Sequence, residues 1–231
     1  MNYLSTHNQH LYGHVTLVSI RKSFSGWVYY YANLLPVSRQ ATVLDIGCGN
    51  GAFVYFLQQS GYQVACGVDV SAEKIAQGRK LWIQNLELFD VMSYLEKSVP
   101  VDCIVACDVL EHFTKQEAFD LLRLISKKLI PGRTPIMQVP NAEGLFYSSI
   151  FFGDYPHEAS YTQSSARQPF LNCGFTAVQC FPTDPVAHGL VSSVRWLLWK
   201  IKVLNFRFWK MVETGNSKGI STSAIVILGV K

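Results

Sequence analysis

The sequence predicts an α/β domain built on a mostly parallel sheet. Between residues 41 and 140, short apolar runs of strand type alternate with segments of helical periodicity. Such alternation requires crossover connections, which place helices on both faces of a parallel sheet. The chain has 231 residues, 49% of them hydrophobic, which suits a single domain with a large core.

The elements expected in this region follow one another at short intervals. Strands are expected at 41–46, 63–70, 86–89, 102–107 and 134–139. Helices are expected at 52–60, 72–81, 92–97 and 115–129. The last of these helices ends before Pro131 and Gly132, two residue types that terminate helices.

On either side of this region the pattern is less regular. Residues 1–40 are first polar and then aromatic, and we expect them to be helical as far as Pro36. After a polar and aromatic stretch at 141–162, the remaining expected elements are a helix at 163–172, a strand at 175–181, a helical insertion within 185–218 and a last strand at 222–230.

Composition and charge narrow the class of protein. The net charge of +4 is too small to indicate nucleic-acid binding. The six cysteines form no CxxC pair and lie mostly in apolar runs, which favours buried, reduced thiols in a cytoplasmic protein. The first residues contain no basic stretch followed by an apolar core, so no signal peptide is expected. No run of about 18 uncharged apolar residues occurs, so we expect no membrane-spanning helix.

The first expected strand ends in a glycine-rich turn, and the sequence from Val43 to Gly51 is VLDIGCGNG. Glycine lacks a Cβ atom and tolerates positive φ, so such a turn lets the backbone approach a ligand closely. Gly47, Gly49 and Ala52 also fit the dinucleotide pattern GxGxxA, so the turn alone would allow NAD. Asp45, just before the turn, would repel a pyrophosphate and attract a cationic ligand. This carboxylate therefore argues against NAD.

Further acidic residues follow the second and third expected strands. Asp69 stands where an adenosine ribose lies in this architecture, and its carboxylate can accept hydrogen bonds from both hydroxyls. Asp90 could accept from the adenine amine, while the Val91 N–H could reach a ring nitrogen. For Asp90 the alternative of a helix N-cap is almost as well supported.

Three segments together carry a family resemblance. VLDIGCGNG, GVDVS and DCIVACDVLEHF resemble the class I S-adenosylmethionine-dependent methyltransferases, in particular small-molecule enzymes similar to the ubiquinone-biosynthesis O-methyltransferases. The resemblance implies a Rossmann-like, seven-stranded and mostly parallel sheet with an antiparallel last strand, here 222–230. It also implies that S-adenosylmethionine, which is cationic and carries no phosphate, lies over the C-terminal ends of the first strands.

The resemblance also assigns roles along the chain. The residues expected to bind the cofactor are Asp45, Gly47, Cys48, Gly49, Asp69, Val70, Asp90, Val91 and Cys107. Within a single domain 1–231, we expect a helical N-terminal cap (1–40), a cofactor-binding core (41–140) and an acceptor-side half (141–231) that includes the insertion 185–218.

Two histidines are candidates for a general base. A hydroxyl acceptor needs a base because its pKa lies far above neutrality, and histidine titrates in a suitable range. His112 follows the fourth strand, next to the expected methyl position, and His157 follows the fifth, where acceptor pockets of the family are built. The alternatives are that His112 only shapes the pocket and that His157 belongs to a surface loop.

A divalent metal is a further option that the sequence leaves open but does not favour. Asp108, Glu111 and His112 could ligate one, as similar patterns in the ubiquinone-type enzymes suggest. Glu111 also suits the beginning of a helix, where its charge interacts favourably with the dipole. We therefore expect no metal.

Residues 194–211 form a basic and aromatic segment without acidic residues. Its five basic residues are Arg195, Lys200, Lys202, Arg207 and Lys210. On a helix they occupy one broad side, and the opposite side carries Leu197, Ile201, Leu204 and Phe208. This pattern suits peripheral contact with an anionic membrane, a cap over the active site or an oligomer interface. Nucleic-acid binding is not expected, since no recognition module accompanies the segment.

These observations predict an S-adenosylmethionine-dependent O-methyltransferase. The basic segment resembles methyltransferases of bacterial polysaccharide gene clusters, which favours a hydroxyl of a sugar or polysaccharide precursor, or of a lipid-linked small molecule, as acceptor. A quinone precursor is an alternative acceptor. The remaining alternatives are a non-catalytic S-adenosylmethionine-binding protein and an NAD-dependent oxidoreductase. The expected location is the cytoplasm, with the inner face of the membrane as an option, and the sequence predicts no oligomeric state.

Overall fold

The computed structural model describes residues 15–231. The stretch in which no signal peptide is expected, and the first part of the predicted N-terminal cap, fall within residues 1–14 and lie outside the described residues. The strands of the sheet are β1 (Thr42–Ile46), β2 (Val64–Asp69), β3 (Leu86–Leu88), β4 (Cys103–Cys107), β5 (Pro135–Pro140), β6 (Thr176–Pro182) and β7 (Ala224–Val230).

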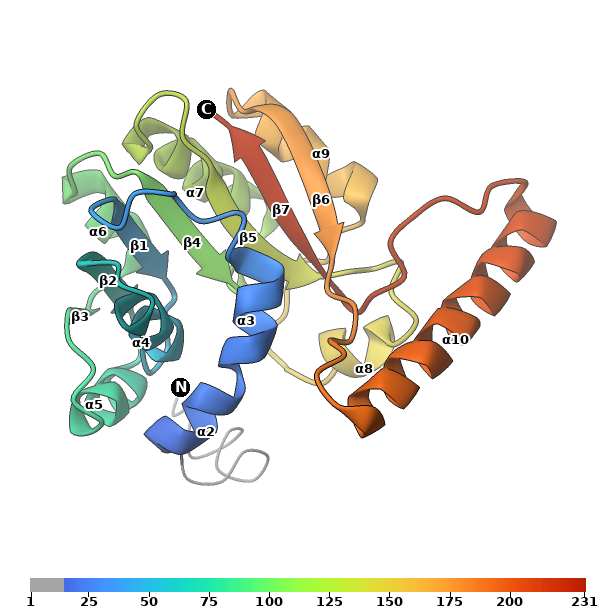
Figure 1. The fold of residues 1–231 in the computed structure, drawn as a ribbon. Helices are drawn as coiled ribbons and strands as arrows, with labels where there is room; N and C mark the ends of the chain where they lie inside the picture. Colours follow the sequence, from blue (N-terminus) through green and yellow to red (C-terminus); the bar gives the residue numbers. More distant parts are fainter. Residues whose placement is uncertain (1–14) are drawn as a thin grey trace.

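These strands form one seven-stranded sheet in the order β3-β2-β1-β4-β5-β7-β6 (Figure 1). Strands β1 to β5 pair in parallel, whereas β7 runs antiparallel to both of its neighbours, β5 and β6. The chain reverses its direction of travel across the sheet between β1 and β4. The C-terminal ends of these two strands therefore border the crevice in which α/β proteins bind ligands. The predicted fold is confirmed, including the antiparallel last strand.

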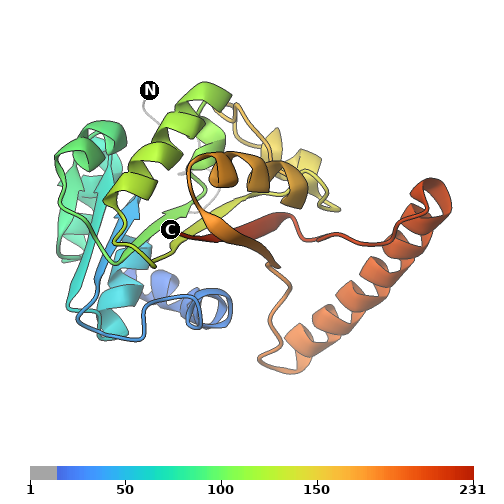
Figure 2. The ribbon, with the colours of Figure 1, turned by 90° about the horizontal axis from the view of Figure 1, so that it is seen from above.

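Helices cover both faces of the sheet, as the alternating pattern requires (Figure 2). One apolar core is closed by α2 (Leu17–Lys22), α3 (Phe24–Tyr31), α4 (Ala52–Gln59) and α5 (Ala72–Lys80). The other core is closed by α6 (Val91–Lys97), α7 (Lys115–Lys128) and α9 (Gln163–Asn172). Both cores combine branched residues of the central strands, which a sheet covered on both faces demands, with apolar residues of these helices.

The N-terminal cap departs from the prediction. Instead of a helix as far as Pro36, two short helices occur, and α3 already ends at Tyr31. The amides of Leu34 and Leu35 both donate to the carbonyl of Tyr31, which closes a turn. Leu35 also precedes a proline, a position that disfavours helical backbone. The prediction of helix for residues 32–36 is therefore wrong.

Three further helices occur in the connections that follow β4, β5 and β6. A short 3-10 helix, η2 (Leu110–His112), follows β4, and α8 (Tyr147–Phe151) lies in the stretch 141–162, for which no helix was predicted. The predicted insertion is a single helix, α10 (Leu190–Thr214), which stands apart from the sheet and the helices on its two faces (Figures 1 and 2). Over residues 15–231, no helix is long and apolar enough to cross a membrane.

Candidate active site

The glycine turn between β1 and α4 needs its glycines for two different reasons. Gly47, Gly49 and Gly51 all have left-handed φ angles, of +67°, +59° and +76°. A Cβ atom on Gly47 would lie 2.4 Å from Cγ2 of Val109, so packing also excludes a side chain there. Above Gly49 the nearest atom would be 3.8 Å away, on the flexible side chain of Lys74. The turn is therefore packed at Gly47 and open to a ligand at Gly49.

Asp69, at the end of β2, holds this turn in place. Its Oδ2 accepts a hydrogen bond of 2.7 Å from the Gly49 amide, and its Oδ1 accepts one of 2.7 Å from the Ser71 amide. Asp45 is buried nearby, and burial followed by the Asp69 carboxylate raises its pKa well above the ordinary value. A bound cation would favour the charged form of Asp45, whereas a pyrophosphate would oppose it further.

The remaining predicted cofactor residues divide into surface and interior positions. Asp90 caps α6 by accepting a 2.9 Å hydrogen bond from the Ser93 amide, so the N-cap alternative describes its role in this structure. Val91 is buried at the first turn of that helix, whereas Val70 is exposed. Cys48 lies buried behind the turn, and its burial raises the pKa of its thiol.

A chain of polar side chains, part of it unforeseen, lines the end of β4. Gln138 Nε2 donates to both carboxylate oxygens of Asp108 at 3.1 Å, and Gln138 Oε1 accepts from the Tyr31 hydroxyl at 2.6 Å. The Cys107 thiol donates in turn to the Tyr31 hydroxyl at 3.7 Å. Asp108 has a left-handed φ of +56°, a conformation that costs energy outside glycine and recurs at functional sites. The only sequence signal for Gln138 was a polar residue inside an apolar strand.

The two candidate histidines, which the sequence offered as alternatives, lie side by side. The ring centroids of His112 and His157 are 4.8 Å apart. Their approach is fixed by backbone, since the amides of Glu158 and Ala159 donate to the carbonyl of Glu111 at 2.7 and 3.1 Å. His157 belongs to a loop, but its side chain is only 8% exposed, so the surface-loop alternative does not describe it.

Each histidine is held in a defined environment. Nδ1 of His157 lies 2.9 Å from the carbonyl of Phe151 in α8, and Nε2 lies 4.0 Å from Oδ2 of Asp154. The carbonyl requires a proton on Nδ1, which leaves the lone pair on Nε2 when the ring is neutral. Burial, and then the neighbouring His157, lower the pKa of His112 below its ordinary value. His112 is therefore neutral at physiological pH.

Glu111 lies buried beneath this pair without a hydrogen-bond partner on either carboxylate oxygen. Burial, and then the Asp108 carboxylate, raise its pKa to about 9. Among the described residues, Glu111, His112 and His157 offer ligand atoms within 4.8 Å of one another, a group of the kind that holds a metal ion. Asp108, the third ligand considered from the sequence, is not part of this group.

Two adjoining cavities lie beside the end of β4. One, of about 500 Å³, is bordered by α3 and by Cys107, Asp108 and Gln138. The other, of about 660 Å³, lies between α8 and α10. Both are lined by Tyr30, Gln138 and Arg195, so they form one continuous acceptor-side region. Lys202 also lines the second cavity, with its Nζ 3.9 Å from the centre of the Phe146 ring.

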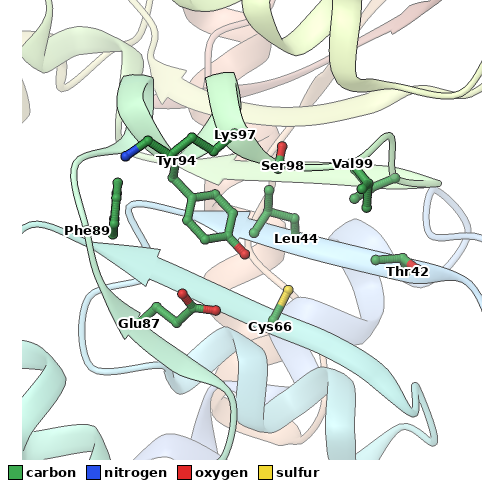
Figure 3. Close-up of a pocket in the computed structure, with 10 residues that line it drawn as sticks. Thr42, Leu44, Cys66, Glu87, Phe89, Tyr94, Lys97, Ser98 and Val99 are labelled. Carbon is green, nitrogen blue, oxygen red and sulfur yellow. The ribbon is translucent and has the colours of Figure 1, made fainter.

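A further cavity, of about 370 Å³, lies under α6 on the face of the sheet (Figure 3). Its lining includes Cys66, Glu87, Tyr94 and Lys97. No residue predicted to bind cofactor or acceptor lines it. The candidate active site is therefore the region at the C-terminal ends of β1, β2 and β4.

Comparisons with known proteins agree with this geometry. A family model described as a methyltransferase domain matches residues 25–182. A comparison with curated protein sequences gave no match. The chain is similar in structure to an S-adenosylmethionine-dependent methyltransferase from Archaeoglobus fulgidus, with 19% identity, a TM-score of 0.68, and coverage of 94% of this chain and 95% of that chain.

Two other solved structures resemble the chain. One is an S-adenosylmethionine-dependent methyltransferase from Mesorhizobium loti, with 13% identity, a TM-score of 0.61, and coverage of 89% of this chain and 98% of that chain. The other is phosphoethanolamine N-methyltransferase 2 from Haemonchus contortus in complex with S-adenosylmethionine. That enzyme is 14% identical with a TM-score of 0.62, and the match covers 100% of this chain and 59% of that chain.

These matches confirm the predicted methyltransferase and its fold. They also support S-adenosylmethionine as the cofactor, since it is the methyl donor of these neighbours and is bound in one of them. The family match covers more than half of the chain, including the glycine turn, the end of β4 and both histidines. The chain therefore belongs to the methyltransferase-domain family.

Proposed function

We propose that the protein transfers a methyl group from S-adenosylmethionine to a hydroxyl of a sugar or polysaccharide precursor or of a lipid-linked small molecule. The observation that carries this proposal is the pair of His112 and His157, 4.8 Å apart and close to the end of β4. A hydroxyl acceptor needs a neutral base beside the methyl-transfer position, and an amine needs one far less.

The residues around the glycine turn support S-adenosylmethionine as the ligand. The open space over Gly49 admits a ligand to the backbone, and Asp45 suits the ammonium group of the methionine part. Asp69, already fixed by two amides, retains lone pairs for the ribose hydroxyls. When bound, S-adenosylmethionine supplies an electrophilic methyl group on a sulfonium, and the protein aligns the acceptor with it and removes the proton.

The two histidines have complementary roles in removing the proton of the acceptor hydroxyl. His157, oriented by the Phe151 carbonyl, keeps the lone pair of its Nε2, and His112 stays neutral because its pKa is lowered. A base with a lowered pKa is unprotonated, and so active, at neutral pH, and it becomes protonated only on acidification. We therefore expect kcat/KM to be constant around pH 7 and to fall as the pH drops below the ordinary histidine pKa of about 6.5.

The acceptor-side cavities favour an anionic acceptor with an apolar part. Arg195 and Lys202 bring positive charge, and Tyr30, Phe146 and Trp199 bring aromatic surface. A saccharide linked to a lipid or nucleotide through phosphate combines these properties. The aromatic lining also favours a quinone precursor, which remains the second candidate. The predicted contact of 194–211 with a membrane is compatible with either acceptor, because either can carry a lipid.

Replacement of each histidine tests the catalytic part of the proposal. His112→Ala and His157→Ala should each lower kcat by about 10²–10⁴-fold, the usual contribution of a general base, while the affinity for S-adenosylhomocysteine stays within twofold. Glu158→Ala, an exposed neighbour of His157, serves as the matched control and should retain full turnover. Full turnover in both histidine variants would contradict the proton-abstraction mechanism.

A binding experiment tests the cofactor part separately. Calorimetry should detect S-adenosylhomocysteine but not NAD, and Asp69→Asn should weaken binding by at least tenfold because an amide accepts fewer hydrogen bonds. Preference for NAD would overturn the assignment. Release of S-adenosylhomocysteine with phosphate-linked saccharides, compared with quinone precursors, then decides between the two acceptor classes. Cofactor binding without turnover on any acceptor would favour the non-catalytic alternative.

A further inference from the structure

The side of α10 that faces away from the protein is apolar along its whole length. The residues on this outer face are Val194, Leu197, Ile201, Leu204, Phe208 and Val212, each between 54% and 71% exposed. They follow the spacing of three and four residues that aligns side chains on one side of a helix. No acidic residue occurs between Asp184 and Glu213. Isolated exposed apolar residues are ordinary, but a contiguous stripe of this length marks an interaction surface.

The opposite side of α10 holds the helix against the body at two places. In the N-terminal half, Trp199 Nε1 donates to Asp184 at 3.0 Å, and Lys200 forms an ion pair of 2.6 Å with the same carboxylate. Near the C-terminal end, Lys210 pairs with Glu143 at 3.4 Å and donates to the carbonyl of Lys218 at 2.9 Å. These specific polar contacts fix the orientation of α10 and therefore direct its apolar outer face away from the body.

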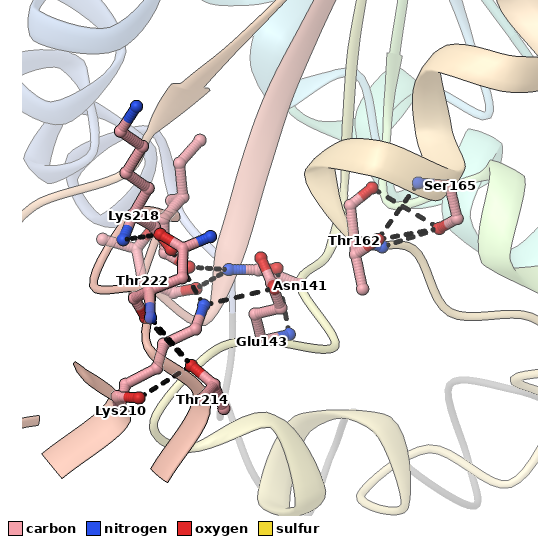
Figure 4. A network of polar contacts seen from close by, with 10 residues as sticks. Asn141, Glu143, Thr162, Ser165, Lys210, Thr214, Lys218 and Thr222 are labelled. Carbon is pink, nitrogen blue, oxygen red and sulfur yellow. Dashed lines mark hydrogen bonds and ion pairs between the residues drawn. The ribbon is translucent and has the colours of Figure 1, made fainter. Parts of the chain in front are cut away.

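The C-terminal anchor is itself rigidly built (Figure 4). Asn141, at the end of β5, is fully buried, and its Nδ2 donates to the carbonyls of Ile220 and Thr222 at 2.7 Å. Its Oδ1 accepts from the Glu143 amide at 3.1 Å, which fixes the partner of Lys210. The segment that returns from α10 to β7 is thus bound to the edge of the acceptor-side region. Whatever covers the outer face of α10 therefore lies next to the acceptor cavities.

From this arrangement, we propose that the outer face of α10 docks the protein on an anionic lipid surface. Basic residues flank the apolar stripe without interrupting it, with Arg207 on one flank and Arg195 and Lys202 on the other, while Lys200 is paired with Asp184. Trp196 and Trp209 lie at the two margins, where an amphipathic ring suits the boundary between lipid and water. Long basic side chains there can bury their stems and extend their charges to anionic headgroups.

The charges favour lipid over a second copy of the chain as the occupant. A symmetric dimer apposes the same patch of both subunits, so pairing through this face would bring basic flanks together. Since no acidic residue lies on the face, repulsion between the flanks would go uncompensated. An anionic bilayer satisfies both the apolar stripe and its flanks. Docking in this orientation brings the cavity lined by Arg195 and Lys202 to the lipid surface, as a lipid-linked acceptor requires.

Vesicle co-sedimentation of the full chain tests the docking. We expect binding to phosphatidylcholine vesicles that contain phosphatidylglycerol, weaker binding when salt is added, and little binding to phosphatidylcholine alone. The double variant Ile201→Glu, Leu204→Glu should bind at least tenfold more weakly and retain its affinity for S-adenosylhomocysteine. The matched control Val37→Glu, Val99→Glu changes two exposed valines outside α10 and should bind vesicles like the wild type.

Three outcomes would overturn the proposal. They are absence of wild-type binding at low salt, unchanged binding of the α10 variant, and a wild-type dimer that the α10 variant dissociates without any vesicle binding. The docking does not depend on the identity of the acceptor. Vesicle binding by a protein without methyl transfer would count against the proposed function alone, whereas turnover of a soluble acceptor without vesicle binding would count against the docking alone.

Discussion

The two longest helices of the described chain, α7 and α10, are both amphipathic, but only α7 buries its apolar side. In α7, Ala118, Leu121, Leu122 and Ile125 lie in the core beneath the sheet. In α10, which has 25 residues against 14 in α7, no residue is buried. An amphipathic pattern therefore predicts a helix with one face to be covered, whereas the partner of that face depends on the rest of the fold.

Apolar groups are usually buried and polar groups exposed. The outer face of α10 departs from this rule by being apolar and exposed, and Glu111 departs from it by being polar and buried. The Glu111 carboxyl is enclosed without a hydrogen-bond partner, shortly before α7. A buried polar group and an exposed apolar face are the two informative departures from ordinary burial, and both cost stability. In this molecule one lies under the candidate catalytic pair and the other lies beside the acceptor cavities.

The largest effect should come from truncating matched leucines in the two helices. Leu121→Ala removes a fully buried side chain and should lower the free energy of unfolding by about 2–5 kcal/mol. Leu204→Ala acts on a side chain that is 71% exposed and should change it by less than about 0.5 kcal/mol. Urea denaturation without lipid measures both values. A loss of about 2 kcal/mol or more from Leu204→Ala would mean that the face is covered in solution.

An effect that depends on pH should come from Glu111. Its pKa is raised to about 9 in the folded protein, so folding favours the protonated form. The contribution is fully present below the unfolded value of about 4.3 and is lost as the pH rises towards 9, by at most about 1.4 kcal/mol per pH unit. Glu111→Gln, which cannot ionise, should therefore gain stability relative to the wild type as the pH rises.

Thermal or urea unfolding at several pH values, with EDTA present to remove divalent ions, measures this difference. Glu158→Gln, at an exposed position in the neighbouring loop, is the control and should show no comparable trend. The range from about pH 5 to 9 covers most of the interval between the unfolded value of about 4.3 and the folded value of about 9. A stability difference between Glu111→Gln and the wild type that stays constant over this range would contradict the enclosed, uncompensated carboxyl.

The sequence predicted what depends on local pattern and missed what depends on distant contacts. All seven strands and the glycine turn follow from apolar runs and glycine spacing, because burial on both faces dictates those residues. The hydrogen bonds from Glu158 and Ala159 to Glu111, which bring His157 to His112, leave no periodic signal. The bond of Tyr31 to Gln138 joins residues far apart in the chain and is equally invisible. The end of α3 at Tyr31 was not predicted, because Pro36 indicates only the last position that the helix could reach.

The smallest effect should come from the N-caps of the same two helices. Thr114 and Glu117 form a capping box on α7, and Thr114→Ala should lower the free energy of unfolding by about 1 kcal/mol. The N-cap of helix α10 is Gly189, which has an extended φ of 174° and offers no side chain to cap the first amides. Gly189→Ser should stabilise the first turn by only a few tenths of a kcal/mol.

These two cap effects need different measurements because the helices are coupled differently to the core. Since α7 packs in the core, its cap should change global unfolding. Since α10 buries no residue, its first turn should open locally, and the gain from Gly189→Ser should appear as amide hydrogen exchange slowed by about twofold in that turn, with global unfolding unchanged. If Gly189→Ser instead raised the free energy of global unfolding, α10 would open together with the core. The two helices would then differ in how exposed they are but not in how cooperatively they unfold.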